Sequence, residues 1–393
     1  MSAIDDRGAL AQAGRSAPAQ VEAARWAISL VFLLNGAGIG LWAAHVPVVQ
    51  ARAGIGTGTL GFLLLTIAGG AIAAMPLSGW LSGRWGTRAV VLASGWMFAL
   101  TSIFLMNVGE VAWLFATAFA FGASNGLLDV SMNTNASEVE TARGIPTMSS
   151  FHGFYSLGGL IGAALGGVLI GAGLGDGRGA LAAGILIAVA VALCARFILA
   201  AAPSAHGSHF AVPRGPALFL GLLALLCFAV EGALVDWSAL LLAERTGAEP
   251  ARAALGYSAF SITMAACRFA GDRLVLRFGA ARIMAAGGLG MCAGLLLAVL
   301  SSHFLLSALG FALIGLAAAN VVPVIFSAAA RVPGMSAGGG LAAVATLGYA
   351  GLLLAPPILG SIAAHSNIAV ALGILSVSGI VIALNAGVVR RKA

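Results

Sequence analysis

The sequence predicts an all-α integral membrane protein with twelve transmembrane helices, divided into two pseudo-symmetric six-helix bundles. Three observations support this fold class. Of the 393 residues, 60% are hydrophobic and only 8% are charged, whereas soluble domains carry about a quarter charged residues. The hydrophobic residues gather in runs close to the ~20 residues that a helix needs to cross a bilayer. Most basic residues lie at the edges of these runs, where they orient membrane helices.

Each predicted span is one of these runs, taken in order. The first run is long enough to cross the membrane and remain there, so we expect no cleavable signal peptide. The third and ninth runs are the shortest, and none of the gaps is large enough for a soluble domain. The runs cover residues 26–48, 59–80, 89–107, 111–135, 147–171, 180–200, 217–243, 254–271, 283–301, 304–330, 339–363 and 367–388.

The basic residues predict the orientation. An even number of spans puts both ends on one side, and a cytoplasmic amino terminus leaves only four of the 20 basic residues outside: Arg52, Arg178, Arg245 and Arg252. Because basic residues favour cytoplasmic loops, we expect both ends to be cytoplasmic. The predicted divisions are a cytoplasmic tail (1–24), a first bundle (25–200), a cytoplasmic linker (201–215) and a second bundle (216–393).

Charge and cysteine content exclude some function classes. The formal net charge of +7 comes from residues at run edges rather than from a basic stripe, so we expect no nucleic-acid partner. The four cysteines lie in four different runs without metal-type spacing. We therefore expect no metal and no cofactor.

Two loops half the chain apart carry related motifs, GRWGTR at 83–88 and LRFGAAR at 276–282. Residues 79–88 read GWLSGRWGTR and resemble the signature loop of the major facilitator superfamily (MFS), although Gly83 stands at its acidic position. The resemblance implies a gating role for Arg84 and Arg88; the alternative is that they are ordinary cytoplasmic arginines in a tight turn. Asp272, four residues after Arg268, is predicted to form a replacement ion pair with it at the inner end of span eight.

Further strings resemble one group of this superfamily. They are NGLLDVSMN at 125–133, SSFH at 149–152 and EGALVDWSA at 231–239, and they are similar to the YbjJ-like bacterial transporters. The resemblance extends along the whole chain. It implies the MFS fold, solute transport and a bacterial inner (cytoplasmic) membrane, but it specifies no substrate.

Three acidic residues lie inside predicted spans: Asp129, Glu231 and Asp236. A charged side chain at the bilayer centre costs about 2.5–3.5 kcal/mol, so such residues usually have a function. Two side chains five residues apart on a helix point in directions about 140° apart, so Glu231 and Asp236 do not face one cavity together. We expect Glu231 to carry the coupling proton, with Asp129 as second candidate, because apolar surroundings favour a protonated carboxyl group. Asp236 is a third candidate; alternatively, it only bonds neighbouring helices.

Polar residues on spans one, four and ten are candidates for substrate binding. Asn125, Asp129 and Asn133 follow at four-residue steps and form a stripe on one helix face, and Asn35 and Asn320 lie on related spans. Alternatively, these amides only join helices. Further candidates, whose alternative role is packing, are His152, Tyr155, Trp237 and Tyr349.

These observations predict a secondary active transporter, not an enzyme. We expect it to move a small neutral or cationic organic solute by alternating access, coupled to protons. An anionic solute would lack a counter-ion, because we expect no arginine or lysine near mid-membrane and place Arg268 near an inner helix end. A proton-driven drug or metabolite exporter is an alternative. A membrane-embedded enzyme or sensor is disfavoured because we find no HExxH or paired-aspartate site and no soluble output domain. The expected partners are the solute, protons and lipid, with the chain acting as a monomer.

Overall fold

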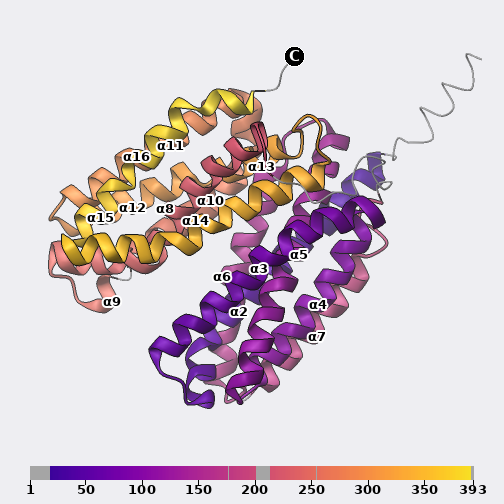
Figure 1. Cartoon of the computed structure of the whole chain (residues 1–393), viewed down its shortest axis with the longest axis horizontal. Coiled ribbons are helices and arrows are strands. Elements are labelled where there is room, and N and C mark those ends of the chain that lie inside the picture. The colour runs from indigo at the N-terminus through magenta and orange to yellow at the C-terminus, as the bar shows by residue number, and fades with distance from the viewer. Residues whose placement is uncertain (1–17, 176, 201–212, 254, 391–393) are drawn as a thin grey trace, which may run out of the picture.

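The computed structural model describes residues 18–175, 177–200, 213–253 and 255–390, apart from the side chains of residues 57, 58, 236, 250 and 251. All regular elements in these ranges are helices (Figure 1). The first half contains α2 (Pro18–Ala53), α3 (Thr57–Trp85), α4 (Thr87–Asn107), α5 (Val111–Arg143), α6 (Met148–Gly171) and α7 (Arg178–Cys194). The second half contains α8 (Pro216–Thr246), α9 (Pro250–Ala253), α10 (Leu255–Phe278), α11 (Ala280–Leu300), α12 (Phe304–Ala318), α13 (Val321–Ala329), α14 (Ala337–His365), α15 (Ile368–Ile374), α16 (Ser376–Leu384) and the 3₁₀ turn η1 (Ala386–Val389).

Every predicted apolar run coincides with one helix or with two or three consecutive helices. Within the described ranges, nine helical segments are long and apolar enough to cross a membrane. The segments for the sixth and twelfth runs are shorter, and α10 contains Arg268, Asp272, Arg273 and Arg277. Helical membrane architecture follows from these segments, whereas the count of twelve spans stays a prediction.

The tenth run is broken rather than continuous. Helix α12 ends at Ala318 and α13 begins at Val321, with Asn320 as its N-cap. Pro323 explains the break, because proline has no N–H to donate to the carbonyl four residues earlier, which here belongs to Ala319. The Ala319 oxygen is therefore available to a side chain from another helix.

Glycines let helices within the first half approach closely. A Cβ atom added to Gly162 on α6 would lie 2.0 Å from the Ala37 carbonyl oxygen on α2, and one added to Gly158 would lie 2.0 Å from that of Leu33. Only glycine permits such backbone contact, as is common between membrane helices. These contacts fix α6, which carries several site residues, against α2.

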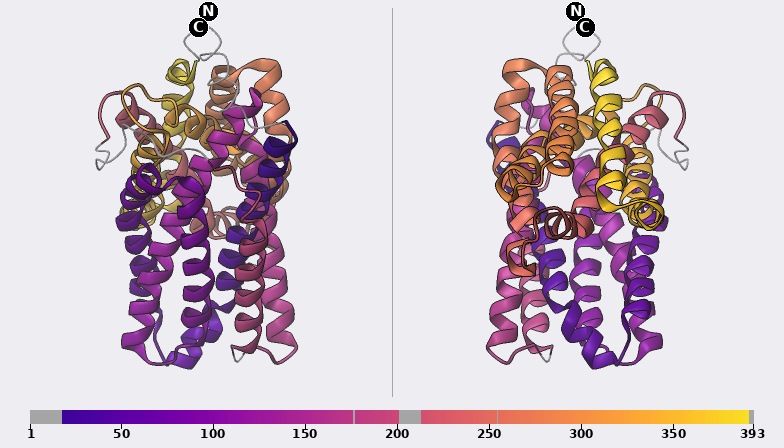
Figure 2. Two further views of the ribbon diagram at one scale, coloured as in Figure 1. Left: turned by 90° about the vertical axis from the view of Figure 1, so that its right-hand side faces the viewer. Right: turned by 90° about the vertical axis from the view of Figure 1, so that its left-hand side faces the viewer.

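The two halves form separate bundles that meet at one end and diverge toward the other (Figure 1). Figure 2 shows α2 to α7 from the sides as an upright bundle. Where the halves meet, α3 packs on α14 and α10 packs on α6. A Cβ atom on Gly79 of α3 would lie 2.8 Å from the Gly338 oxygen of α14, so this crossing is also close.

Both ends of the described chain lie at the end where the halves meet. Glu22, near the start of α2, pairs with Arg143 at the end of α5 (3.5 Å). Gly144 and Arg390 line one cavity there. Helix α2 begins at Pro18, inside the predicted tail of residues 1–24. Most of the predicted linker, residues 201–212, lies outside the described residues.

Candidate functional site

A cavity of about 300 Å³ lies between the two halves. Helices α2, α5 and α6 form one wall, and α8, α10, α13 and α14 form the other. This central cavity combines apolar rings with convergent polar groups, which is typical of sites for small molecules. Its polar lining residues are Asn125, Asp129, His152, Tyr155, Glu231, Arg268 and Tyr349.

Helix α5 supplies the predicted polar stripe. Asn125 and Asp129 line the cavity, and Asn133 lies behind Asp129, donating to its backbone oxygen (2.8 Å) and to its carboxylate (3.3 Å). Asn35 on α2 donates to the Asn125 amide oxygen (2.8 Å), so this amide pair also joins two helices. The Asp129 Oδ2 atom is buried and has no hydrogen-bond partner among the described residues, which leaves it available to a ligand.

Helix α6 contributes His152 and Tyr155. The buried His152 ring lies edge-on between Phe32 (5.6 Å between ring centres) and Phe326 (5.8 Å). Its Nε2 atom is also buried without a hydrogen-bond partner in the part of the chain that the structure describes. The ring is fixed by packing, and it faces the cavity with an unused polar atom.

Helices α8 and α10 bring together the two charged residues of the second half that line the central cavity, Glu231 and Arg268. Glu231 lines the cavity as predicted, and its Oε2 atom lies 3.7 Å from a terminal nitrogen of Arg268. The prediction for Arg268 was wrong: it lines the cavity and pairs with Glu231, not with Asp272. The long side chain accounts for the error, because it carries the guanidinium away from its helix backbone.

The guanidinium of Arg268 also has two neutral partners. It donates to the hydroxyl of Ser156 on α6 (2.7 Å) and to the Ala319 oxygen (3.3 Å). The latter is the carbonyl that Pro323 leaves unpaired. The break in the tenth run thus supplies one of the groups that hold Arg268.

The remaining predicted binding residues lie in different surroundings. Tyr349 on α14 lines the cavity, interacts with Asp129, and packs edge-on against Phe228 (5.4 Å). Asn320 donates to Cys267 (3.5 Å) and Trp237 packs on the core of the second half; neither lines the central cavity. Asp236 lies on α8, but its side chain is outside the described residues.

Asp272 bridges the halves where they meet. Its carboxylate accepts hydrogen bonds from the backbone N–H groups of Ser149 (2.9 Å) and Ser150 (3.2 Å) at the start of α6. These N–H groups have no partner within the helix, and the helix dipole favours a negative charge beside them. Asp272 therefore contacts the other half through a helix N-terminus rather than through an arginine.

Glu140, which the sequence did not single out, completes this contact. It is buried on α5, accepts from the N–H groups of Thr147 and Met148 (both 2.9 Å), and pairs with Arg331 of the second half (3.5 Å). Two carboxylates, one from each half, thus cap the first turn of α6. We call Asp272, Glu140 and Arg331 the inter-half contact.

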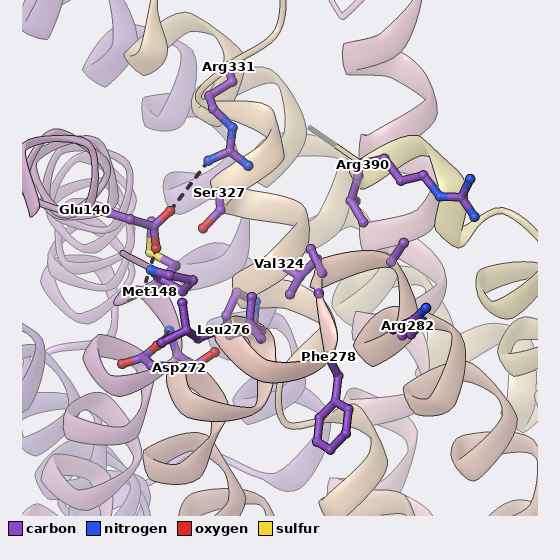
Figure 3. A pocket seen from close by; sticks show the side chains of 18 of the residues that line it. Glu140, Met148, Asp272, Leu276, Phe278, Arg282, Val324, Ser327, Arg331 and Arg390 are labelled. Carbon is purple, nitrogen blue, oxygen red and sulfur yellow. Dashed lines mark hydrogen bonds and ion pairs between the residues drawn. The ribbon is translucent and has the colours of Figure 1, made fainter. Parts of the chain in front are cut away.

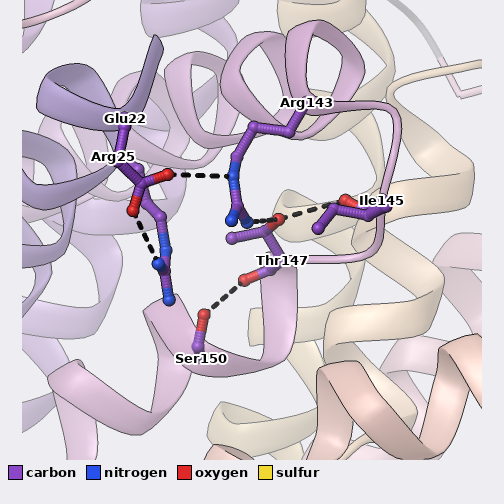
Figure 4. Close-up of polar contacts among 6 residues, drawn as sticks. All are labelled: Glu22, Arg25, Arg143, Ile145, Thr147 and Ser150. Carbon is purple, nitrogen blue, oxygen red and sulfur yellow. Dashed lines mark hydrogen bonds and ion pairs between the residues drawn. The ribbon is translucent and has the colours of Figure 1, made fainter. Parts of the chain in front are cut away.

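The loop before α6 is fixed to α2 and α5 (Figure 4). Arg143 contacts Glu22 (3.5 Å) and donates to the Thr147 hydroxyl (2.7 Å), and the Ser150 hydroxyl donates to the Thr147 oxygen (2.9 Å). The start of α6 is thus held by groups of the first half as well as by those of the second half.

A second cavity of about 720 Å³ lies beside the inter-half contact (Figure 3). Arg282, Arg331 and Arg390 line it together with Glu140 and Asp272. It shares no lining residue with the central cavity. This second cavity lies where the two halves touch, and it borders the inter-half contact. None of the polar groups of the central cavity lines it.

The signature-like loop lies at the same end of the first half. Arg84 is exposed and stacks over the Trp80 ring (5.8 Å). Arg88 follows Thr87, whose hydroxyl donates to Glu138 on α5 (2.7 Å). Neither arginine lines either cavity. Within the described residues, no three His, Cys, Asp or Glu side chains gather as a metal site.

Comparison with known proteins gives relatives over nearly the whole chain, although no protein-family profile matches. An MFS-type transporter of Yersinia pestis is 36% identical over 363 residues, covering 92% of this chain and 94% of the relative. A transporter of Sinorhizobium fredii is 34% identical over 368 residues (92% and 96%). Membrane protein MosC of Rhizobium meliloti is 32% identical over 364 residues (91% and 88%).

Solved structures share the fold at low sequence identity. The E. coli fucose:proton symporter in the outward conformation matches with a TM-score of 0.78 at 17% identity, covering 94% of this chain and 99% of that chain. A human organic anion transporter matches with a TM-score of 0.77 at 17% identity, covering 95% and 100%. With its helical bundles, its central cavity and these relatives, the chain belongs to the MFS-type transporter family.

Proposed function

We propose that this secondary transporter is proton-coupled and moves a compact organic solute through the central cavity by alternating access. One observation carries the proposal: Asp129 from the first half and Glu231 from the second line the same cavity. Acidic residues inside membrane helix bundles commonly bind and release protons along a transport path. Sites between two related halves are typical of transporters that expose them alternately to each side.

In this proposal, Glu231 carries the coupling proton and Asp129 is the second candidate. Asn125, His152, Tyr155 and Tyr349 contact the solute, since all four line the cavity. The sequence favoured a neutral or cationic solute because no cavity arginine was expected. Arg268 removes that reason, so the class must also include solutes with an anionic group.

The inter-half contact acts as the cytoplasmic gate in this proposal. The distribution of basic residues favours a cytoplasmic position for the end where the halves meet. The protein would then be closed to the cytoplasm and would face outward, in a bacterial inner membrane. Similarity to the fucose symporter in its outward conformation supports this assignment.

The test uses purified protein in proteoliposomes that contain a pH-sensitive dye. A thermal-shift screen of sugars, amines, amino acids and carboxylates first selects a solute that stabilises the protein. That solute should drive proton movement in wild-type vesicles, and an imposed pH gradient should drive its accumulation. Glu231→Gln should retain solute exchange and lose uphill accumulation. Accumulation by Glu231→Gln at the wild-type level would refute the assignment to Glu231.

A further inference from the structure

Among the described residues that line the central cavity, Arg268 is the only arginine or lysine. Its side chain is 8% exposed, and that of Glu231 is 15% exposed. Arg268 Nη2 lies 3.7 Å from Glu231 Oε2, which is longer than the ~2.7–2.9 Å of a charge-assisted hydrogen bond. Ser156 and Ala319 hold the guanidinium in place, and Glu231 balances its charge without a short bond.

The formal charges of the cavity depend on one proton. Asp129, Glu231 and Arg268 sum to −1 when both acids are ionised. A proton on Glu231 brings the sum to zero and leaves the negative Asp129 on α5 opposite the positive Arg268 on α10. It also leaves a buried guanidinium without its counter-ion, which is costly unless another anionic group replaces it.

We propose that Arg268 is the anion-binding residue of the central cavity. Until Glu231 is protonated, its carboxylate pairs with Arg268 and takes the place of the solute's carboxylate. The inference rests on the proposed proton-coupled function and names its substrate class: a compact zwitterion. Its carboxylate binds Arg268, whose planar fork matches carboxylate geometry. Its ammonium group binds Asp129 beside Tyr349, because the buried Oδ2 atom of Asp129 accepts no hydrogen bond from the described residues.

The size and walls of the cavity agree with this class. Its volume of about 300 Å³ lies at the lower end of the range for ligand pockets, so the solute is small. Phe32, Phe228 and Phe326 line it and can cover the apolar part of a solute or the face of a cation. Tyr155 lines the same cavity as Asp129 and Arg268.

Several other titratable groups face Glu231 or Arg268, so a pH response alone would not identify Glu231. The Cys227 sulfur on α8 lies 3.6 Å from the Glu231 carboxylate. The remaining groups come from α5, α6, α10 and α14, and they are Asp129, His152, Tyr155, Cys267 and Tyr349. The test therefore replaces Glu231 by its neutral isostere at fixed pH.

The experiment measures binding to purified protein without any gradient, using three matched probes. Benzoate supplies a carboxylate, benzamide is its neutral isostere, and 4-(aminomethyl)benzoate adds an ammonium group. At pH 8, Glu231→Gln should bind benzoate at least tenfold more tightly than wild type does, with benzamide affinity unchanged. Arg268→Lys in the Glu231→Gln background keeps the charge but not the fork, and it should lose most of the gain. Equal benzoate affinity in wild type and Glu231→Gln would overturn the proposal.

A second measurement keeps the test valid if Glu231→Gln does not fold. Glu231→Ala also removes the carboxylate and should bind benzoate at least tenfold more tightly than wild type does at pH 8, with benzamide affinity unchanged; an unchanged benzoate affinity would overturn the proposal. The zwitterionic probe should bind more tightly than benzoate, and Asp129→Asn should remove that advantage. If benzoate binds as well as the zwitterion does, the zwitterion assignment is wrong.

These outcomes separate the inference from the proposed function. Solute-driven proton flux in vesicles without any benzoate preference would leave the transporter proton-coupled and remove the role of Arg268. A benzoate preference in a protein that moves no protons would leave the anion site and remove the coupling.

Discussion

Asp272→Ala should shift the transporter toward a state in which the halves separate where they now meet. The Asp272 carboxylate lies on α10 and accepts from two N–H groups at the start of α6, at 2.9 Å and 3.2 Å. Those donors belong to the other half, so the bonds stabilise only the state in which the halves touch. Such a differential contact is what changes a conformational equilibrium.

The magnitude follows from the two hydrogen bonds and the helix dipole. A hydrogen bond to a charged group contributes about 1.5–3 kcal/mol, and a charge at a helix N-terminus about 0.3–1 kcal/mol. Asp272 is only partly buried, so water replaces some of these interactions after substitution. We expect a loss of about 2 kcal/mol, which changes the ratio of the two states by about 30-fold. Asp272→Asn keeps an acceptor oxygen without the charge and should give a smaller shift.

Pulsed electron spin resonance can measure this shift between labels at Ala142 on α5 and Arg277 on α10. Both positions are exposed near the inter-half contact, and the four native cysteines are replaced beforehand. Asp272→Ala should add a longer distance to the distribution. Arg273→Ala, at an exposed position next to Asp272, is the control and should leave the distribution unchanged. An unchanged distribution in Asp272→Ala, or the same change in Arg273→Ala, would refute the reasoning.

Two further predictions concern packing and the second part of the inter-half contact. Gly162→Ala should lower the melting temperature, because its Cβ would lie 2.0 Å from the Ala37 oxygen and overpacking costs about 1–3 kcal/mol. Gly167→Ala is the control, because a Cβ there would have no neighbour within 4 Å. Equal melting temperatures for the two variants would contradict the packing account. A double-mutant cycle on the Glu140 and Arg331 pair (Glu140→Gln, Arg331→Ala) should give a coupling free energy of less than about 1 kcal/mol. The Arg331 side chain is 36% exposed, and solvent screens such pairs. A much larger coupling would make this pair, and not Asp272, the main part of the inter-half contact.

The sequence predicted the helical membrane fold because a helix in lipid needs about 20 consecutive apolar residues, and such runs are visible in the sequence itself. It also predicted Asp129 and Glu231 as cavity residues, because ionised groups inside apolar runs have few other places to lie. The four-residue spacing located Asn125 on the same face as Asp129. Each of these inferences uses information from within a single helix.

The sequence failed where the outcome depends on partners from other helices. Arg268 was assigned to the inner end of its span, but Ser156 and the carbonyl freed by Pro323 hold its guanidinium at the cavity. The sequence did not single out Glu140, because only the fold brings the start of α6 to it. Pro323 was the one available signal, since a proline inside an apolar run predicts a broken helix and a free carbonyl.

The most direct test of the central claim is the number of protons that the protein exchanges when it binds its solute. Calorimetry in buffers of different ionisation enthalpy gives this number for wild type, Glu231→Gln and Asp129→Asn. The account predicts that wild type takes up about one proton per solute bound near neutral pH and that Glu231→Gln takes up none. Binding by wild type without proton uptake, or the same uptake in Glu231→Gln, would contradict it.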